Sequence, residues 1–181
     1  IADQQLKMKI FIIVACTADG GIGKKGQLPW PSYMKEDMKH FTAMTKGPGK
    51  AVVMGRKTWE SLPERHRPLK DRVNIVISNT LTEPESNGAV VLSHPQLAIQ
   101  FGLMNNIDEL WVIGGASIFD SVLGSDVNID AIYLTEFNHR DPDCDTHFSL
   151  SHVYSRYVEE HMMGPFTQDE YTYKISKYVS K

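Results

Sequence analysis

The sequence predicts a single α/β domain, built on a central, mostly parallel twisted sheet with flanking helices and an antiparallel C-terminal hairpin. Strand-like apolar runs alternate with helical patterns through most of the chain, which is typical of parallel sheets joined by helices. Near the C-terminus, two segments of alternating polarity follow each other directly and indicate a hairpin. With 181 residues and 41% hydrophobic content, the chain can bury one full core.

The strands are indicated by short runs rich in β-branched and other apolar residues. The run at residues 9–16 is apolar almost throughout, as expected for a central strand covered on both faces. Further strands are expected at residues 50–54, 72–78, 89–92, 109–113 and 129–137. The hairpin is expected at residues 156–162 and 171–179.

Helices are expected between the strands, at residues 55–62, 95–104 and 116–123, and in a segment for which Ser32 is the N-cap. Glycines at 20, 21, 23 and 26 predict a mobile loop, and residues 138–151 a polar one. Gly21, Gly23 and Gly26 have the spacing of a dinucleotide-binding fingerprint, but the structural context of that motif is missing. The motif needs a helix directly after the glycines, and here Pro29 and Pro31 follow instead.

Composition and charge exclude several classes of function. The net charge of −3 is scattered, which argues against nucleic acid or an anionic membrane as the main partner. Two distant cysteines, Cys16 and Cys144, predict free thiols in a reducing compartment, and we expect a cytoplasmic monomer without a membrane span or bound metal. Residues 1–7 are expected to be an N-terminal extension to a domain over residues 8–181.

An acid falls on the apolar side of the helix after Pro31. At 100° per residue from Met34, the apolar stripe contains Met38, Phe41 and Met44, and Asp37 lies inside it at about 300°. Glu36 lies on the far side, at about 200°. A buried carboxylate without a partner costs on the order of several kcal/mol, so Asp37 is expected to have one.

Two other places favour anion binding. The helix that opens at Gly55 carries Arg56 and Lys57 in its first turn, where acids are normally preferred, and a bound anion would account for this. A solvated basic turn is an equal alternative. Gly114-Gly115 separates a buried strand from a helix, a junction that lets the backbone approach a ligand or simply pack tightly.

Over about residues 8–180 the chain resembles dihydrofolate reductase. The resemblance is carried by the joint order of short motifs: Ile13-Val14-Ala15, Gly21-Ile22-Gly23, Leu28-Pro29-Trp30, Asp37-Met38-Lys39-His40-Phe41, Met54-Gly55-Arg56-Lys57-Thr58-Trp59, Ser61-Leu62-Pro63, Arg67-Pro68-Leu69, Arg72, Trp111-Val112-Ile113-Gly114-Gly115 and Asp145-Thr146. It implies a dihydrofolate-reductase-like fold and NADPH-dependent reduction of 7,8-dihydrofolate, which supports one-carbon metabolism and thymidylate synthesis. Antifolates would be inhibitors.

The resemblance also assigns roles. Asp37 would bind the 2-amino group and N3 of the pterin, and Leu28 and Trp30 complete the expected catalytic set. The family acid commonly lies closer to the tryptophan than Asp37 does, at a spacing that Glu36 satisfies, so Glu36 stays an alternative. Asp145 would hydrogen-bond the loop that closes over the nicotinamide, and Gly114-Gly115 resembles the family's cis peptide.

The remaining roles follow the family's motifs. Substrate-binding residues are expected at Ile13, Val14, Ala15, Asp37, Met38, Phe41, Ser61, Leu62, Leu69, Arg72, Ile113, Phe119 and Thr135. Of these, Arg72 would pair with the glutamate tail and Thr135 would reach the pterin amino group through a water. Cofactor-binding residues are expected at Ala15, Ile22, Gly26, Gly55, Arg56, Lys57, Thr58, Ser78, Asn79, His94, Gly114, Gly115, Ala116, Ser117 and Ile118.

Two departures from the family pattern affect the expected chemistry. Asn79 stands where the family commonly has an arginine for the 2′-phosphate of NADPH, so Arg56 and Lys57 must carry the preference over NADH, with less margin. Phe119 stands in place of a family tyrosine. The rival interpretations are a riboflavin-pathway reductase of the same fold and a non-catalytic pteridine- or nucleotide-binding protein.

Overall fold

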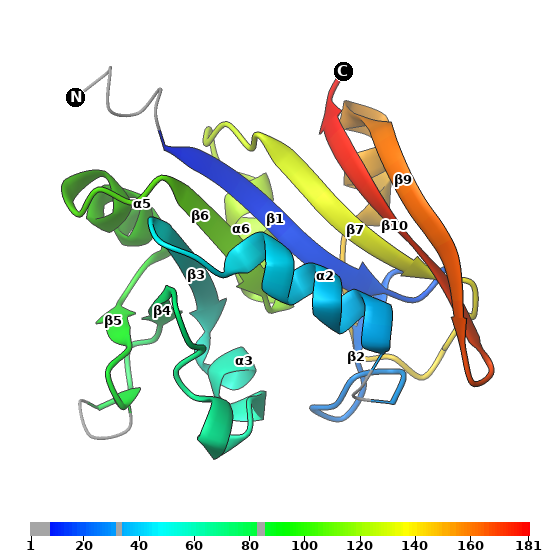
Figure 1. The fold of residues 1–181 in the computed structure, drawn as a ribbon, viewed down its shortest axis with the longest axis horizontal. Helices are drawn as coiled ribbons and strands as arrows, with labels where there is room; N and C mark the ends of the chain where they lie inside the picture. The colour runs from blue at the N-terminus through cyan, green and yellow to red at the C-terminus, as the bar shows by residue number, and fades with distance from the viewer. Residues whose placement is uncertain (1–7, 32–33, 83–85) are drawn as a thin grey trace. The chain divides into compact units, whose positions relative to one another are not determined.

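The computed structural model describes residues 8–31, 34–82 and 86–181. It confirms the α/β class, with a mostly parallel sheet and an antiparallel C-terminal hairpin (Figure 1). The chain divides into two compact units: residues up to Phe11 with Met44–Ile129, and Ile12–Ala43 with Asp130–Lys181. Strand β1, Lys9–Cys16, has residues in both units and is buried along most of its length, as its apolar run predicts.

Parallel strands form the first unit. Their order is β5-β4-β3-β6, and each neighbouring pair is parallel. Their bounds are β3 Lys50–Gly55, β4 Val73–Ile77, β5 Val90–Leu92 and β6 Glu109–Gly114. Because parallel strands all end at the same edge of a sheet, the loops after β3, β4, β5 and β6 gather at one edge, where α/β proteins bind ligands.

The helices of the first unit follow these strands. They are α3 Arg56–Ser61, the 3-10 turn η1 Glu64–His66, α5 Pro95–Met104 and α6 Ala116–Leu123. The bounds of α5 and α6 agree with the sequence prediction. Trp59 of α3 and Trp111 of β6 are each 1% exposed and are among the largest buried side chains of the core.

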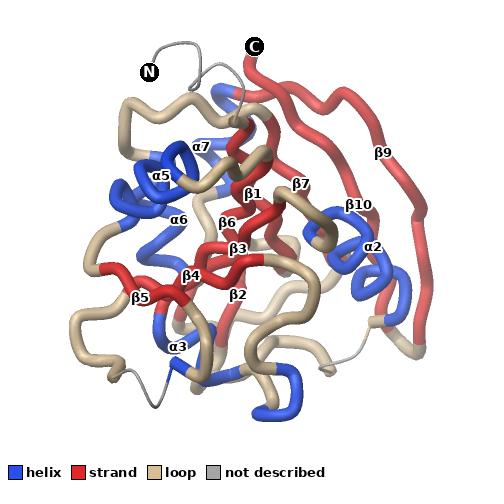
Figure 2. Tube along the Cα trace, turned by 60° about the vertical axis from the view of Figure 1, so that its left-hand side comes forward, coloured by secondary structure: helices blue, strands red, loops and turns tan. Residues whose placement is uncertain are grey.

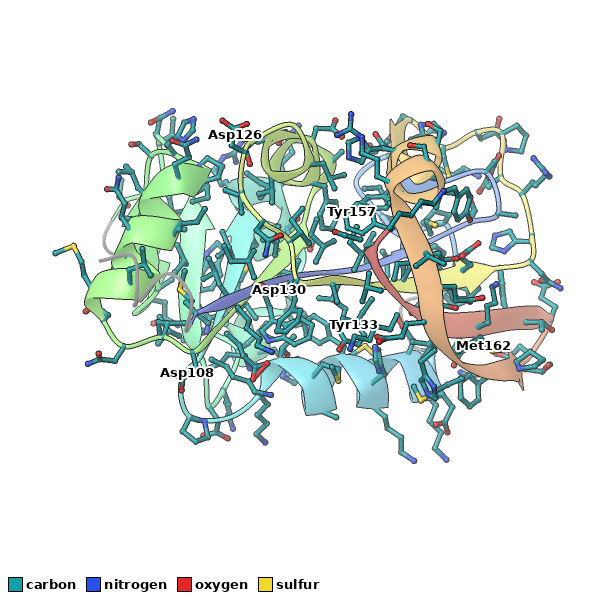
Figure 3. All side chains as sticks on the ribbon, turned by 90° about the horizontal axis from the view of Figure 1, so that it is seen from above. Asp108, Asp126, Asp130, Tyr133, Tyr157 and Met162 are labelled. Carbon is teal, nitrogen blue, oxygen red and sulfur yellow. The ribbon has the colours of Figure 1, made fainter. Side chains whose placement is uncertain are left out.

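The strands of the second unit lie in the order β1-β7-β10-β9 (Figure 2), and β10 is antiparallel to both β7 and β9. Their bounds are β7 Ala131–Phe137, β9 Tyr157–Gln168 and β10 Tyr171–Ser180. Two helices, α2 Lys35–Thr45 and α7 Leu150–Arg156, lie on opposite faces of these strands (Figure 3). Tyr133 of β7 points toward α2, where its ring lies 5.8 Å from that of His40 (Figure 3).

The first arm of the hairpin, predicted at residues 156–162, is too short, because β9 extends to Gln168. Two predicted loops also contain helix or strand. The glycine loop contains a short strand, β2 Gly21–Gly23, which pairs with β8 Thr146–His147. The segment predicted as a polar loop to residue 151 therefore contains β8 and the start of α7. The predicted N-cap Ser32 and the proposed extension at 1–7 lie outside the described residues. Among the described residues, no helix is both long and apolar enough to cross a membrane.

Candidate active site

The second unit holds Asp37 against the sheet. Asp37 lies in the first turn of α2, where a negative charge is favoured by the helix dipole. Its Oδ1 accepts a hydrogen bond of 2.7 Å from the hydroxyl of Thr135 on β7, a residue that is 2% exposed. Burial raises the pKa of Asp37, and the hydrogen bond from Thr135 opposes that rise. The structure thus joins two residues predicted for the pterin site.

Glu36 has a different environment. Its carboxylate lies 3.9 Å from Nζ of Lys39 on the outer side of α2. Of the two adjacent acids, Asp37 is therefore the one that points inward, as the helical periodicity predicts. The apolar stripe predicts that Met38 is buried, but it is 42% exposed. The buried face of α2 is centred on the direction of Asp37 rather than on that of Met34, and Met38 lies on the far side of Met34 from Asp37.

Trp30 is part of a buried cluster in the second unit. Its ring stacks on Phe137 at 4.3 Å, and Met34, Tyr173 and Ile175 complete the cluster, with Ala15 packed against it. Ile13 and Val14 on β1 are buried at 7% and 8% exposure, while Phe41 and Ile22 are half-buried. The predicted residues around the pterin therefore include both core and partly accessible side chains.

The loop before Trp30 borders a hollow of about 310 Å³. Leu28, which is 47% exposed, lines it together with Trp30, Lys24, Lys25, Gln27, Pro29, Pro31, Asp141 and Tyr171. The loop is held at Lys25, whose backbone N–H donates to Oδ2 of Asp145 at 2.9 Å. This hydrogen bond lowers the pKa of Asp145, and the contact is of the kind expected from the family resemblance.

In the first unit, two glycine junctions approach each other at the ends of β3 and β6. A Cβ built on Gly55 would lie 4.0 Å from the backbone nitrogen of Gly115, and one on Gly115 would lie 3.5 Å from Oγ1 of Thr58. The Gly114–Gly115 peptide bond is cis, and Gly114 has φ +119°, a conformation that L side chains rarely adopt. Side chains at these positions would fill the space that the glycines leave open.

These junctions suit an anionic ligand. Gly55 and Gly115 are the N-caps of α3 and α6 and have no side chain to accept from the first N–H groups of those helices. Thr58, Ala116 and Ser117 lie beside them, and Ile118 packs against Gly55. Two neighbouring helix N-termini with a close backbone approach fit the pyrophosphate of a dinucleotide.

Arg56 is engaged within its own helix. Its Nη1 lies 2.9 Å from both carboxylate oxygens of Glu60, one turn later. The two side chains are 40% and 47% exposed, so this ion pair is weak and easily exchanged for a phosphate. Lys57 and Asn79 are exposed.

Several predicted polar residues already bind the backbone of neighbouring residues. Ser61 donates to the Thr58 carbonyl at 2.6 Å. Ser78 Oγ accepts from two backbone N–H groups in the loop after β4. His94 Nδ1 accepts from the Gln96 N–H and so caps α5. These contacts shape the loops around the strand ends of the first unit.

Arg72 is fixed beside the start of β4. Its Nε donates to the Lys70 carbonyl and its Nη1 to the hydroxyl of Thr45, both at 2.8 Å. Burial lowers the pKa of Arg72, and the nearby Asp71 opposes this. Leu69 is held by the Asn74 side chain, which bonds both its N–H and its carbonyl at 2.9 Å.

Sequence reasoning missed the residues that hold the predicted ones in place. Glu60 could have been found, because it lies four residues after Arg56 on a helix. Thr45 and Tyr173 had no local signal, since their contacts to Arg72 and to the start of α2 join residues 27 and 137 positions apart. The remaining predicted residues are half-buried or buried in the first unit: Leu62, Ile113, Ile118 and Phe119.

The known proteins that match this chain share one description. A family model described as dihydrofolate reductase matches residues 9–180. The dihydrofolate reductase of Schistosoma mansoni is 38% identical over 184 residues, which cover 94% of this chain and 96% of that protein. Those of Heliothis virescens and Rattus norvegicus are 39% and 43% identical, covering 78% and 61% of this chain and 80% and 64% of their own lengths.

Proposed function

The chain belongs to the dihydrofolate reductase family, and from that premise we propose that it reduces 7,8-dihydrofolate to 5,6,7,8-tetrahydrofolate with NADPH as its cofactor. It is an oxidoreductase that uses a nicotinamide cofactor, acts on folate and binds antifolates. When bound, NADPH supplies the hydride that C6 of the pterin receives, and N5 is protonated. The protein's own part is to bind and orient the two molecules.

Asp37 is the residue on which this proposal chiefly rests. Its carboxylate points inward and is held through Oδ1 by Thr135. In the proposed complex it accepts hydrogen bonds from the 2-amino group and N3 of the pterin, a planar pair of donors that matches a carboxylate. Asp37 orients the ring in this way, and a water rather than Asp37 delivers the proton to N5.

The cofactor phosphates are assigned to the first unit. The backbone N–H groups at the starts of α3 and α6 would hold the pyrophosphate beside Thr58, where Gly55 and Gly115 leave room for it. Arg56 and Lys57 would bind the 2′-phosphate that distinguishes NADPH from NADH. Because Asn79 adds no positive charge there, the preference for NADPH depends mainly on Arg56.

Arg72 is assigned to the glutamate tail of the substrate. Thr45 and the Lys70 carbonyl hold its guanidinium in place, so little freedom is lost when a carboxylate binds. A bond of this kind to a charged group contributes roughly 1.5–3 kcal/mol. The apolar residues Leu62, Leu69 and Phe41 would contact the body of the substrate.

The reaction is tested by following the absorbance of the reduced nicotinamide with dihydrofolate and either NADPH or NADH. We expect turnover that depends on dihydrofolate, is faster with NADPH at low cofactor concentration, and is stopped by an antifolate. Equal KM values for NADPH and NADH would contradict the cofactor assignment. Turnover that an antifolate leaves unchanged would contradict the site.

We also propose that the protein acts as a monomer in the cytoplasm. Both cysteines are buried free thiols, in keeping with a reducing compartment. Sedimentation equilibrium should give the mass of one chain, 20.4 kDa. A mass of two chains would contradict the monomer, and fractionation of cells would test the compartment.

A further inference from the structure

The first turn of α2 is hydrogen-bonded to side chains of the C-terminal hairpin. Met34 precedes the helix and has no side-chain oxygen to cap it, so the first N–H groups need acceptors from elsewhere. Oε1 of Gln168, at the end of β9, accepts from the Lys35 N–H at 2.7 Å. The hydroxyl oxygen of Tyr173, on β10, accepts from the Glu36 N–H at 3.2 Å.

Tyr173 also faces the backbone of Asp37 itself. Burial raises the pKa of Tyr173, and hydrogen bonds from the backbones of Asp37 and Glu36 act against that rise. Thr135 binds the side chain of Asp37 from β7. Three adjacent strands, β7, β10 and β9, thus each contribute one side chain to a single helical turn.

The position of the Tyr173 oxygen is fixed by its ring. Tyr173 is 2% exposed and pairs in register with Phe137 on β7 and Phe166 on β9. Its ring centroid lies 4.9 Å from that of Phe137 and 5.7 Å from that of Phe166. A packed ring of this kind holds its hydroxyl in one place and serves as a rigid acceptor.

We propose that Tyr173 is a positioning residue for dihydrofolate reduction, whose hydroxyl oxygen fixes the start of α2 and hence the direction of the Asp37 carboxylate. This inference rests on the proposed role of Asp37 as the pterin ligand. A two-point hydrogen bond to a flat ring tolerates only small errors in direction, and a misplacement of about 1 Å can cost about 100-fold in rate.

The test uses Tyr173→Phe, which keeps the packed ring and removes the acceptor. We expect kcat/KM for dihydrofolate to fall about tenfold, antifolate affinity to fall by a similar factor, and KM for NADPH to stay unchanged. Tyr178→Phe is the matched control, because it removes a hydroxyl from the same strand whose bond, at 3.2 Å, goes to Glu136. It should lower thermal stability without changing dihydrofolate kinetics.

A double variant separates positioning from general loosening. If Tyr173 acts through Asp37, then Tyr173→Phe has little further effect on kcat/KM in an Asp37→Asn background. An equal loss in both backgrounds, or equal kinetics for Tyr173→Phe and Tyr178→Phe, would overturn the inference. Should Tyr173→Phe not fold, Gln168→Leu removes the acceptor for Lys35 and should raise KM for dihydrofolate about threefold; an unchanged KM would count against the inference.

The single variant Asp37→Asn keeps the two proposals apart. A severe loss of activity in Asp37→Asn with no special effect of Tyr173→Phe would overturn only the positioning role. Wild-type activity in Asp37→Asn would overturn the proposed role of Asp37, and the role of Tyr173 with it.

Discussion

Asp37→Asn is expected to stabilise the fold at neutral pH while it removes most of the activity. Burial raises the pKa of Asp37, and the hydrogen bond from Thr135 offsets only part of this effect. The folded protein therefore binds the carboxyl proton more tightly than the unfolded chain does. The ionised form, which the proposed function needs, is the form that the fold disfavours.

The direction of the pH dependence follows from linkage. A carboxyl whose folded pKa lies above its unfolded value contributes stability that is fully present below the unfolded pKa and is lost as the pH rises through the folded pKa. Because the pKa of Asp37 is raised, the wild-type protein loses this contribution as the pH rises toward neutrality. Asparagine carries no charge at any pH, so its advantage over the wild type should grow over the same pH range.

The size of the effect can be bounded. The amide oxygen of asparagine can still accept from Thr135, so the change removes a partly buried charge and keeps the hydrogen bond. We expect a gain of about 1 kcal/mol at neutral pH, or about 2–4 °C in Tm for a chain of this length. Loss of the charged partner of the pterin should cost about 2–5 kcal/mol, which is roughly 30- to 5,000-fold in kcat/KM.

The assay is thermal unfolding from acid to neutral pH, combined with steady-state kinetics. Glu36→Gln is the matched control, since that carboxylate lies 3.9 Å from Lys39 on the outer side of the helix, and it should change neither quantity much. A less stable Asp37→Asn protein at neutral pH, or a gain that persists in acid, would refute the reasoning. A severe loss of activity only in Glu36→Gln would assign the pterin to Glu36 instead of Asp37.

Three further predictions concern the charges assigned to ligand binding. Arg56→Ala should raise KM for NADPH far more than KM for NADH, and equal effects on both would contradict its contact with the 2′-phosphate. Glu60→Gln should lower KM for NADPH by about two- to fivefold relative to NADH, because the Glu60 carboxylate occupies Nη1 of Arg56; an unchanged ratio would exclude this competition. Arg72→Leu should raise KM for dihydrofolate roughly 10- to 150-fold but leave that for dihydropteroate, which lacks the glutamate tail, unchanged; a similar rise for both would place the tail elsewhere.

The elements predicted best from the sequence are those with a clear pattern of apolar residues of their own. The apolar run of β1 and the patterns of α5 and α6 gave their bounds as the structure has them. The inward direction of Asp37 followed from helical periodicity alone. The prediction that Met38 lies on the buried side of α2 was wrong, because Met38 is 42% exposed. A helical wheel gives the direction of each side chain but does not show which directions the sheet covers.

The missed elements were short or depended on distant partners. β2 and β8 contain three and two residues, too few for a period to be detected, and are defined only by pairing with each other. The same limit applies within the site. The contact of Thr135 with Asp37 joins residues 98 positions apart, so the sequence could propose both residues for one ligand but not that they bond to each other.

Two carboxylates beside β7 show how a functional acid differs from a structural one. Glu136 points to the face opposite Thr135, where Tyr154 donates to its Oε2 at 2.7 Å and Tyr178 to its Oε1 at 3.2 Å. Both of its oxygens therefore bind side chains that join α7 and β10 to β7.

For Asp37, the hydrogen bond that the described part of the chain provides uses Oδ1. A carboxylate held at one oxygen keeps its direction and has more lone pairs left for hydrogen bonds from a ligand than one held at both oxygens. This difference, rather than burial alone, makes Asp37 the acid that is suited to bind the pterin.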